Sequence, residues 1–453
     1  MSKERDMTVG RPLPILLSFI LPLLLGLLFQ QFYSMVDTVV VGKSLGVEAL
    51  AGVGSTGSIS FLIIGLCTGI CSGFAIPVAQ KFGERDEDGL RRFVGNMVWL
   101  GSLIALVMTL LTTLGCRWIL TAMNTPEDTF SYAYDYIFLI FLGIPATMLY
   151  NTLSGILRSL GDSRTPLLFL IFSSLLNVAL DLLFVVTLKM GVAGAGWATL
   201  ISQLISGLLC LVYMAKKFPI LRLSRDDLKA RKLYAVRLLF MGLPMGLQYS
   251  ITAIGTILLQ TAVNGLGSVA MAAVTASGKV INLFACPYDA MGAAMATYCG
   301  QNVGACKLDR LGQGIRSCSL MGLGYFFLAL VAMLLFAPQC AMLFLDPAEP
   351  QLALLVRLTS QYVVTLCAFF FPLALVNILR FSIQGMGYSM FAILAGVLEM
   401  LARTAVGSIF VPLFGYNAAC FASPAAWLCA DLFLLPACIH CIRHLRKLFP
   451  AAA

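Results

Sequence analysis

Charged residues are scarce in this sequence. Only 11% of the 453 residues are Asp, Glu, Lys or Arg, whereas 60% are hydrophobic. Soluble domains carry about 25% charge. The longest polar stretch, Lys216 to Arg237, is shorter than an ordinary soluble domain. The composition therefore excludes a water-soluble globular protein and indicates a protein that lies in a lipid bilayer. We expect no appended soluble domain.

The sequence also lacks the motifs of nucleotide-driven and catalytic proteins. The phosphate-binding pattern GxxxxGK[ST] does not occur, and neither do GxSxG and HExxH. The group Cys438, His440, Cys441 and His444 contains metal-ligand types but has no second ligand cluster elsewhere. We therefore expect no enzymatic activity, no cofactor and no metal site.

Long apolar runs are abundant. Residues 15–28, for example, are apolar on every side, which favours helices over the alternating strands of an outer-membrane barrel. A spanning helix needs about 20 apolar residues, and twelve such segments lie between charged or Gly-, Pro- and Asn-rich breaks. The expected spans are 13–36, 50–78, 93–116, 130–152, 165–188, 192–215, 233–264, 268–299, 311–337, 351–379, 389–412 and 417–442. The sequence predicts an all-α integral membrane protein with twelve transmembrane helices.

The positions of the basic residues predict an orientation. Of the 30 Lys and Arg residues, 24 fall on the side shared by both termini, including Arg380 in the expected loop after the tenth span. The four on the opposite side are Lys43, Arg117, Lys189 and Arg357, and Lys279 and Arg403 lie within spans. Basic residues near span ends are retained in the cytoplasm. We expect a plasma-membrane protein with both termini in the cytoplasm. Its net charge of +9 is explained by this orientation and by contact with membrane lipids, and we expect no nucleic-acid binding.

An internal repeat relates the two halves. Residues 1–225 can be laid over 226–453 without reversing the chain. Gly46, Ala49, Ala51 and Val53 meet Gly267, Ala270, Ala272 and Val274 at an offset of 221; Asn151 and Gly161 meet Asn377 and Gly387 at 226; Gly191 and Ala198 meet Gly415 and Ala422 at 224. Chance similarity is the alternative, because Gly and Ala are common where membrane helices pack closely. We predict two six-helix bundles in a parallel repeat, 1–225 with spans 1–6 and the following loop and 226–453 with spans 7–12, an architecture typical of alternating-access transporters.

Several polar residues fall inside the expected spans. Asp37 closes the first span, and Asn177 and Asp181 share one helix face in the fifth. At about 1.5 Å per residue, both acids and Thr199 of the sixth span reach the outer half of the membrane. An all-oxygen pocket of this kind suits a proton or a sodium ion. The second half lacks it, since Asp37, Asn177 and Asp181 correspond to Leu258, Arg403 and Gly407. Asp37 as an interfacial helix-end residue is the alternative.

A second group of polar residues within the spans allows more than one interpretation of its role. Glu399 and Arg403 lie four residues apart in the eleventh span and form either a structural ion pair or a functional charge network. Lys279 either reaches Asp289, Asp37 or Glu399 or lines a cavity. Further candidates for a polar cavity wall are Gln30, Tyr33, Gln248, Asn264 and Asn282.

Prolines within the spans predict bends. We expect helix bends at Pro22, Pro145, Pro244, Pro287 and Pro372. In a protein whose halves move, such bends are hinge candidates.

The sequence resembles the multidrug and toxic compound extrusion (MATE) family over nearly its whole length. The resemblance rests on SMVDTVVVGKSLGVEALAGVG (Ser34 to Gly54), GILRSLGDSRTP (Gly155 to Pro166), NVALD (Asn177 to Asp181), GVAGAGWATLISQ (Gly191 to Gln203) and GQNVGACKLDR (Gly300 to Arg310). It implies two six-helix lobes in a V, and proton- or sodium-coupled export of amphipathic, often cationic compounds. A flippase for a lipid-linked saccharide in the same broad superfamily is the alternative function.

The resemblance also implies roles for individual residues. Asp37, Asn177, Asp181 and Thr199 match the family's cation pocket in the amino-terminal lobe, and Pro22 matches a position where the first helix bends in some members. Some members carry acids in the seventh and tenth helices, whereas GLPMGLQYSITAIG (Gly242 to Gly255) and the tenth span offer none. We expect coupling through the first half alone, small-molecule cargo and a monomeric protein.

Overall fold

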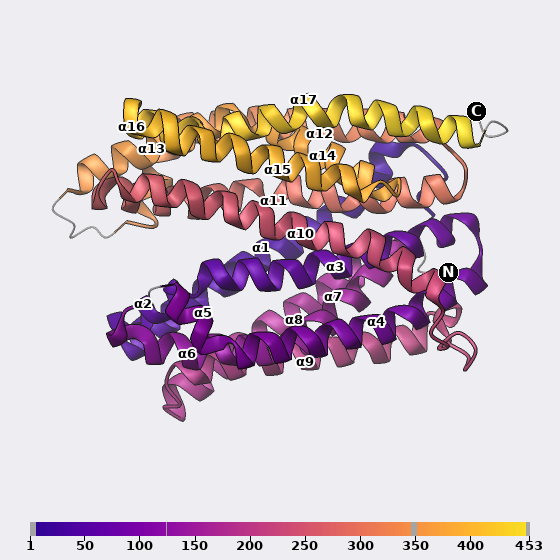
Figure 1. The fold of residues 1–453 in the computed structure, drawn as a ribbon, viewed down its shortest axis with the longest axis horizontal. Helices are drawn as coiled ribbons and strands as arrows, with labels where there is room; N and C mark the ends of the chain where they lie inside the picture. The colour runs from indigo at the N-terminus through magenta and orange to yellow at the C-terminus, as the bar shows by residue number, and fades with distance from the viewer. Residues whose placement is uncertain (1–5, 124, 346–350, 450–453) are drawn as a thin grey trace. The chain divides into compact units, whose positions relative to one another are not determined.

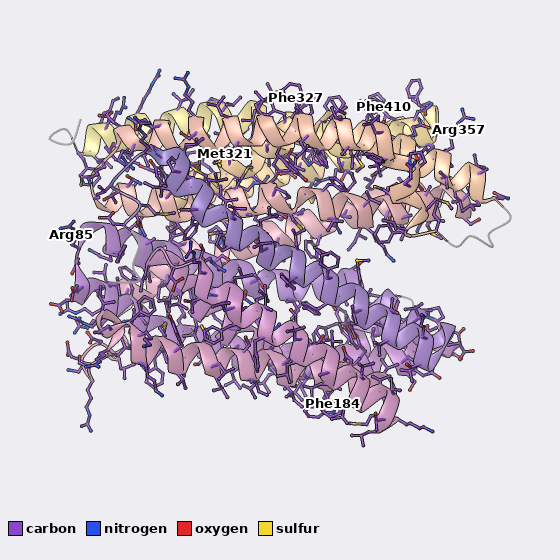
Figure 2. All side chains as sticks on the ribbon, turned by 180° about the vertical axis from the view of Figure 1, so that it is seen from behind. Arg85, Phe184, Met321, Phe327, Arg357 and Phe410 are labelled. Carbon is purple, nitrogen blue, oxygen red and sulfur yellow. The ribbon has the colours of Figure 1, made fainter. Side chains whose placement is uncertain are left out.

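The computed structural model describes residues 6–123, 125–345 and 351–449, and it consists of long helices joined by short connections (Figure 1). Within these residues, ten helices are long and apolar enough to cross a membrane, and two bent helix pairs raise the number to twelve if each pair is one span. This confirms the predicted all-α membrane protein. Large apolar side chains face outward, as Phe327 and Phe410 do in Figure 2, with 57% and 47% exposure. Such a surface suits lipid tails.

One compact unit contains Asp6 and Leu21–Ser250. Its elements are most of α1 (Pro12–Leu45), then α2 (Val47–Ser55), α3 (Gly57–Glu84), α4 (Glu87–Leu114), α5 (Cys116–Ala122), α6 (Glu127–Leu142), α7 (Ile144–Ser159), α8 (Arg164–Asp181), the π-helix η1 (Leu182–Thr187), α9 (Val192–Lys217), the 3-10 helix η2 (Pro219–Leu221) and the start of α10 (Lys232–Asn264). Helix α3 packs on α7, and α9 packs on α6, α7 and α8. These contacts bring α6, α8 and α9 together around one interior.

Among the described residues, the other compact unit contains Met7–Ile20, 251–345 and 351–449. After the end of α10 follow α11 (Ser268–Gly304), α12 (Asp309–Met342), α13 (Leu352–Ala368), α14 (Phe370–Gly385), α15 (Ser389–Ala405), the π-helix η3 (Val406–Phe410), α16 (Val411–Phe414) and α17 (Tyr416–Leu448). Helix α11 packs on α14, and α17 packs on both α14 and α15. The division at 225/226 that the repeat suggests stays a prediction, because the contact units divide within α1 and α10.

The backbone confirms the parallel repeat. Left-handed φ angles recur at the same offsets as the sequence matches: 88° and 99° at Gly46 and Gly267, 59° and 55° at Arg85 and Cys306, 81° and 97° at Gly161 and Gly387, and 67° and 61° at Gly191 and Gly415. The π-helices η1 and η3 also occupy equivalent positions. Chance similarity of Gly-rich sequence would not reproduce turns and π-helices together, so both halves share one helical plan.

Two predicted proline bends are confirmed. Helices α6 and α7 meet at 45° at Gly143, and α13 and α14 meet at 51° at Phe369. Pro145 and Pro372 lie in the first turn after each break, where a missing N–H costs no helix hydrogen bond. Pro22 lies inside the continuous helix α1, just after the boundary at Ile20 between its two units. Its role as a hinge stays a prediction.

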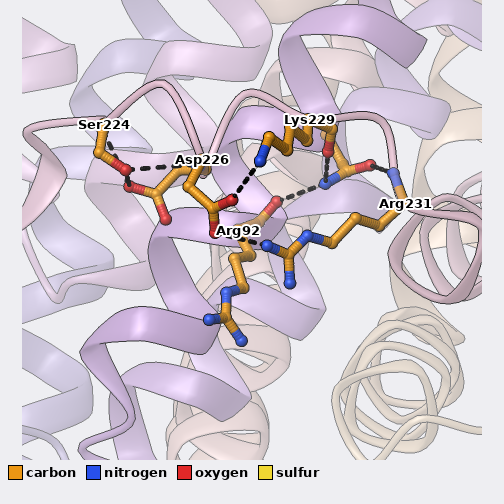
Figure 3. A network of polar contacts seen from close by, with 7 residues as sticks. Arg92, Ser224, Asp226, Lys229 and Arg231 are labelled. Carbon is orange, nitrogen blue, oxygen red and sulfur yellow. Dashed lines mark hydrogen bonds and ion pairs between the residues drawn. The ribbon is translucent and has the colours of Figure 1, made fainter.

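The polar connection between α9 and α10 is fixed to α4 (Figure 3). Asn96 accepts a hydrogen bond from the Arg231 backbone at 2.9 Å, and Asp226 forms ion pairs with Lys229 and Arg231 at 2.9 and 2.5 Å. The hydrogen bond from Lys229 holds the pKa of Asp226 below its ordinary value. The basic loop that supports the predicted orientation therefore has a defined conformation.

Candidate functional site

Helix α8 carries two of the predicted site residues at its end. Asn177 and Asp181 lie four residues apart, and they are 2% and 0% exposed. Asp181 is the last residue of α8, and the chain continues directly into the π-helix η1. π-helical turns are rare and occur frequently at functional sites, because the wider turn redirects side chains. The fifth span thus changes helical geometry next to its buried acid.

Asp37 approaches the same region from α1. Its carboxylate accepts a hydrogen bond from the Tyr136 hydroxyl of α6 at 3.5 Å. Asp37 and Asp181 are also close enough for the charge of Asp37 to act on Asp181. Two acids from different helices therefore lie near each other within the first unit.

The carboxylate and amide oxygens in this region are buried without hydrogen-bond partners in the described part of the chain. They are Oδ1 of Asp37, Oδ1 of Asn177 and both carboxylate oxygens of Asp181. The Asn177 amide nitrogen donates to the Thr199 hydroxyl at 3.4 Å, which leaves its carbonyl oxygen as an acceptor. Buried polar atoms normally have partners. These four acceptor atoms receive no hydrogen bond from the described residues, and a proton or a hard cation would satisfy them.

A narrow recess adjoins this set. It is lined by Tyr33, Leu170, Ser173, Ser174, Asn177, Thr199, Ser202 and Gln203, and it is too narrow for a water molecule. Ser173 donates to the Ser202 carbonyl at 3.2 Å and so joins α8 to α9. Sequence reasoning missed Tyr136, Ser173, Ser202 and Gln203. Two of them follow from helix spacing, since Ser173 precedes Asn177 by four residues and Gln203 follows Thr199 by four.

Two acids of the second unit are buried, Glu399 and Asp431, and one oxygen of Asp431 has no partner among the described residues. Glu399 is 3% exposed, and its two oxygens are engaged separately: Arg380 of α14 binds Oε1, and Arg403 binds Oε2 at 3.2 Å. Assignment of Arg380 to a cytoplasmic loop is wrong, because α14 continues to Gly385 and buries this side chain to 5% exposure. The apolar run ends at Leu379, but the partner acid on α15 stabilises the next helical turn. Glu399 is therefore not a free carboxylate.

The remaining predicted residues are dispersed. On α11, Lys279 and Asn282 are exposed, and the Lys279 ammonium lies 6.0 Å from the centre of the Phe344 ring. Within the described residues Lys279 forms no ion pair, so an ion pair with Glu399 is not formed. On α1, Gln30 is exposed and hydrogen-bonds Tyr33. Gln248 of α10 is 5% exposed.

Known proteins share this chain's sequence pattern and fold. The MatE family model matches residues 22–183 and 244–409, one block in each half. The chain belongs to the MatE family. MatE proteins are transporters and not enzymes, which confirms the resemblance and the expectation that this chain has no enzymatic activity.

Individual MatE relatives differ in their named cargo. The probable multidrug resistance protein YoeA of Bacillus subtilis is 32% identical over 305 residues, which is 66% of this chain and 66% of that protein. The FAD transporter of Shewanella oneidensis is 22% identical over 415 residues, 90% of each chain. A crystal structure of MATE in complex with MaL6 aligns with a TM-score of 0.92 at 22% identity, covering 99% of this chain and 100% of that one. The structural match shows the MATE fold.

Proposed function

We propose that this MatE protein is an antiporter that uses a proton or sodium gradient to export amphipathic, often cationic organic compounds by alternating access. One observation carries the proposal: four buried acceptor oxygens from Asp37, Asn177 and Asp181 lie in one helical unit without partners among the described residues. Such burial is unfavourable unless a ligand satisfies it. Cation binding therefore changes the free energy of the conformation that contains this site, and coupling requires such a change.

The coupling step follows from charge. Two nearby carboxylates repel each other, and a bound cation removes that repulsion. A ligand shifts a conformational equilibrium only by its differential affinity for the two states. We propose that the cation binds tightly in the conformation that closes the pocket, and that cargo binding favours the conformation in which the cation leaves. Thr199 supports the site by holding the Asn177 amide, so that its carbonyl oxygen faces the cation.

The cargo class follows from the relatives and from the exposed polar residues. YoeA is named as a multidrug resistance protein, which supports organic compounds as cargo. Lys279 and Asn282 on α11 and Gln30 on α1 are exposed within spans, where a polar group facing lipid is unfavourable. We propose that Lys279 and Asn282 in the second unit, and Gln30 in the first, face water and are available to contact cargo. The single chain contains both repeats, which supports a monomer as the working unit.

The basic residues support the orientation of the proposed exporter. Most Lys and Arg residues lie on the side of both termini, including the ordered loop between α9 and α10. We propose that this side faces the cytoplasm in the plasma membrane. Export then moves cargo away from the basic side.

A lipid-linked saccharide flippase is disfavoured by the arginines. Binding of pyrophosphate needs several cationic side chains free to contact its oxygens. Arg380 and Arg403 instead both bind Glu399. The charge that a flippase would use is largely neutralised within the protein.

Transport by reconstituted vesicles tests the proposal. The purified chain is placed in lipid vesicles with a fluorescent organic cation, and a pH gradient and a sodium gradient are imposed in separate experiments. We expect one gradient to drive uphill dye movement and an ionophore for that ion to stop it. Equal dye movement in protein-free vesicles, or no response to either gradient across a panel of dyes and antibiotics, would exclude the proposed antiport.

A further inference from the structure

A groove of about 420 Å³ lies where α1 and α12 begin, within the second unit. The start of α1 supplies one wall with Arg11, Pro12, Leu13 and Pro14, and the beginning of α12 supplies the other with Gln313, Arg316 and Ser317. Both helices are candidate membrane spans. The groove therefore lies at the level of the lipid headgroups.

Hydrogen bonds from α11 and α12 fix the segment before α1. The Met7 backbone N–H donates to Gln301 at 2.9 Å, and the Met7 carbonyl accepts from Arg310 at 3.2 Å. The Lys307 ammonium donates to the Thr8 carbonyl at 2.9 Å. Met7 and Thr8 are 1% and 5% exposed. This anchored backbone leads directly into α1, so the wall containing Arg11 has a defined position against α12.

The groove carries two uncompensated positive charges. Arg11 and Arg316 are exposed, and among the described residues neither forms an ion pair. Asp309, the acid at the start of α12, is engaged by Arg446 at 2.7 Å. Two guanidinium groups with an amide and a hydroxyl nearby suit a phosphate, because guanidinium binds phosphate oxygens through paired charged hydrogen bonds.

Apolar surface continues from the groove along both helices. Leu13 and Leu17 on α1 are 45% and 47% exposed, and Leu320 on α12 is 57% exposed. Phe327, also on α12, is 57% exposed and points outward in Figure 2. Leu320 lies one helical turn after Arg316. A phosphate site that passes directly into exposed apolar side chains fits a molecule with acyl chains better than it fits free phosphate.

We propose that this groove binds one anionic phospholipid, with its phosphate between Arg11 and Arg316 and its acyl chains along Leu17 and Leu320. The lipid joins the start of α1 to α12 from outside, in addition to the hydrogen bonds around Met7. Nothing in this assignment depends on the coupling ion or the cargo of the transporter.

Native mass spectrometry of the full chain in detergent tests the proposal. Phosphatidylglycerol or phosphatidylcholine is added at equal concentration, and bound lipid is measured for wild type and for Arg11→Gln/Arg316→Gln. We expect phosphatidylglycerol affinity to fall about fivefold for each arginine removed, and phosphatidylcholine to bind more weakly than phosphatidylglycerol to the wild type. The matched control is Arg164→Gln/Arg237→Gln, which removes two exposed charges from the starts of α8 and α10 and should bind as wild type does.

A second variant fills the groove without changing its charge. Ser317→Phe keeps both arginines, and we expect it to lose the lipid as the double variant does. Equal loss in the Arg164/Arg237 control would overturn the proposal, since that result means unspecific charge attraction. Three other results would also overturn the proposal. Ser317→Phe could bind phosphatidylglycerol as the wild type does, or the wild type could bind phosphatidylcholine equally well. The third is full displacement of phosphatidylglycerol by an equal concentration of glycerol phosphate.

Discussion

The two halves of this transporter share a backbone and differ in their buried charge. Asn177 and Asp181 of α8 correspond to Arg403 and Gly407 at the offset of 226. In the first half both oxygens of Asp181 and one of Asp37 lack partners among the described residues. The second half holds Glu399 between two arginines and, within the described part of the chain, leaves one oxygen of Asp431 without a partner. The repeat has preserved turns, bends and π-helices and has not preserved ion chemistry. The proposed antiport therefore rests on the acid pair of the first half.

The same substitution should consequently have opposite effects in the two halves. Neutralising an acid that has no partners removes its repulsion with the neighbouring carboxylate and removes an unfavourable buried charge. Neutralising an acid between two arginines leaves buried cations without a counter-charge, which is strongly destabilising. Stability and transport together distinguish these cases.

The largest effect on transport is expected for Asp181→Asn. We predict that this variant loses gradient-driven efflux of a fluorescent cation and that its thermal unfolding temperature rises, because the buried charge is gone. Vesicle efflux and thermal unfolding of the purified protein provide the two measurements. Asp128→Asn is the matched control, since Asp128 is an exposed acid in the first turn of α6. Wild-type efflux by Asp181→Asn would refute its coupling role.

The largest effect on stability is expected for Glu399→Gln. Because Arg380 and Arg403 then lose their counter-charge, we predict a loss of about 3–5 kcal/mol in the free energy of unfolding. Arg403→Gln should cost less, since Arg380 still binds Glu399. Chemical unfolding gives the ranking, and efflux per folded molecule should persist in both variants. Intact stability with lost efflux in Glu399→Gln would show instead that the second half takes part in coupling.

An intermediate and equal effect is expected where the halves agree. Gly46 and Gly267 have φ angles of 88° and 99°, and an added Cβ would meet nothing within 4 Å at either position. Replacement by Ala therefore tests backbone strain alone, and we predict a loss of about 1–3 kcal/mol for each variant. Unfolding measured side by side checks the equality. A large cost at one glycine and none at the other would mean that the halves do not share this turn.

The smallest effect is expected at Thr199. Thr199→Val removes the hydroxyl that binds the Asn177 amide, and a lost hydrogen bond of about 1 kcal/mol weakens the cation site about fivefold. The apparent affinity for the driving ion in vesicle transport provides the measurement. Ser423→Ala, at the equivalent position of the second half, should leave that affinity unchanged. A matching loss at Ser423 would remove the distinction between the halves.

The sequence predicts the frame of this protein well. Runs such as 15–28 are too long and too apolar for a soluble core, so the spans follow from hydrophobicity. Gly46, Gly161 and Gly191 match glycines of the other half in sequence, and these positions have left-handed φ angles in the structure. The position of Asp181 on the same face as Asn177 also follows from helical spacing.

Contacts between distant helices limited the prediction of the sites. Arg380 pairs with an acid nineteen residues away on another helix, so local hydrophobicity placed it in a loop. Tyr136 reaches Asp37 across 99 residues of sequence, and Met7 meets Gln301 across 294. The periodicity of a sequence does not predict contacts between residues so far apart in the chain. The roles of Asp37, Asn177, Asp181 and Thr199 in coupling stay predictions.

Cation release on cargo binding tests the central claim most directly. A transported dye is added to the purified protein, and displaced protons are measured in weakly buffered solution or displaced sodium by a sodium-sensitive indicator. The account predicts release by wild type and by Glu399→Gln, and no release by Asp37→Asn or Asp181→Asn. Release by Asp181→Asn equal to that of the wild type, with the dye still bound, would contradict it.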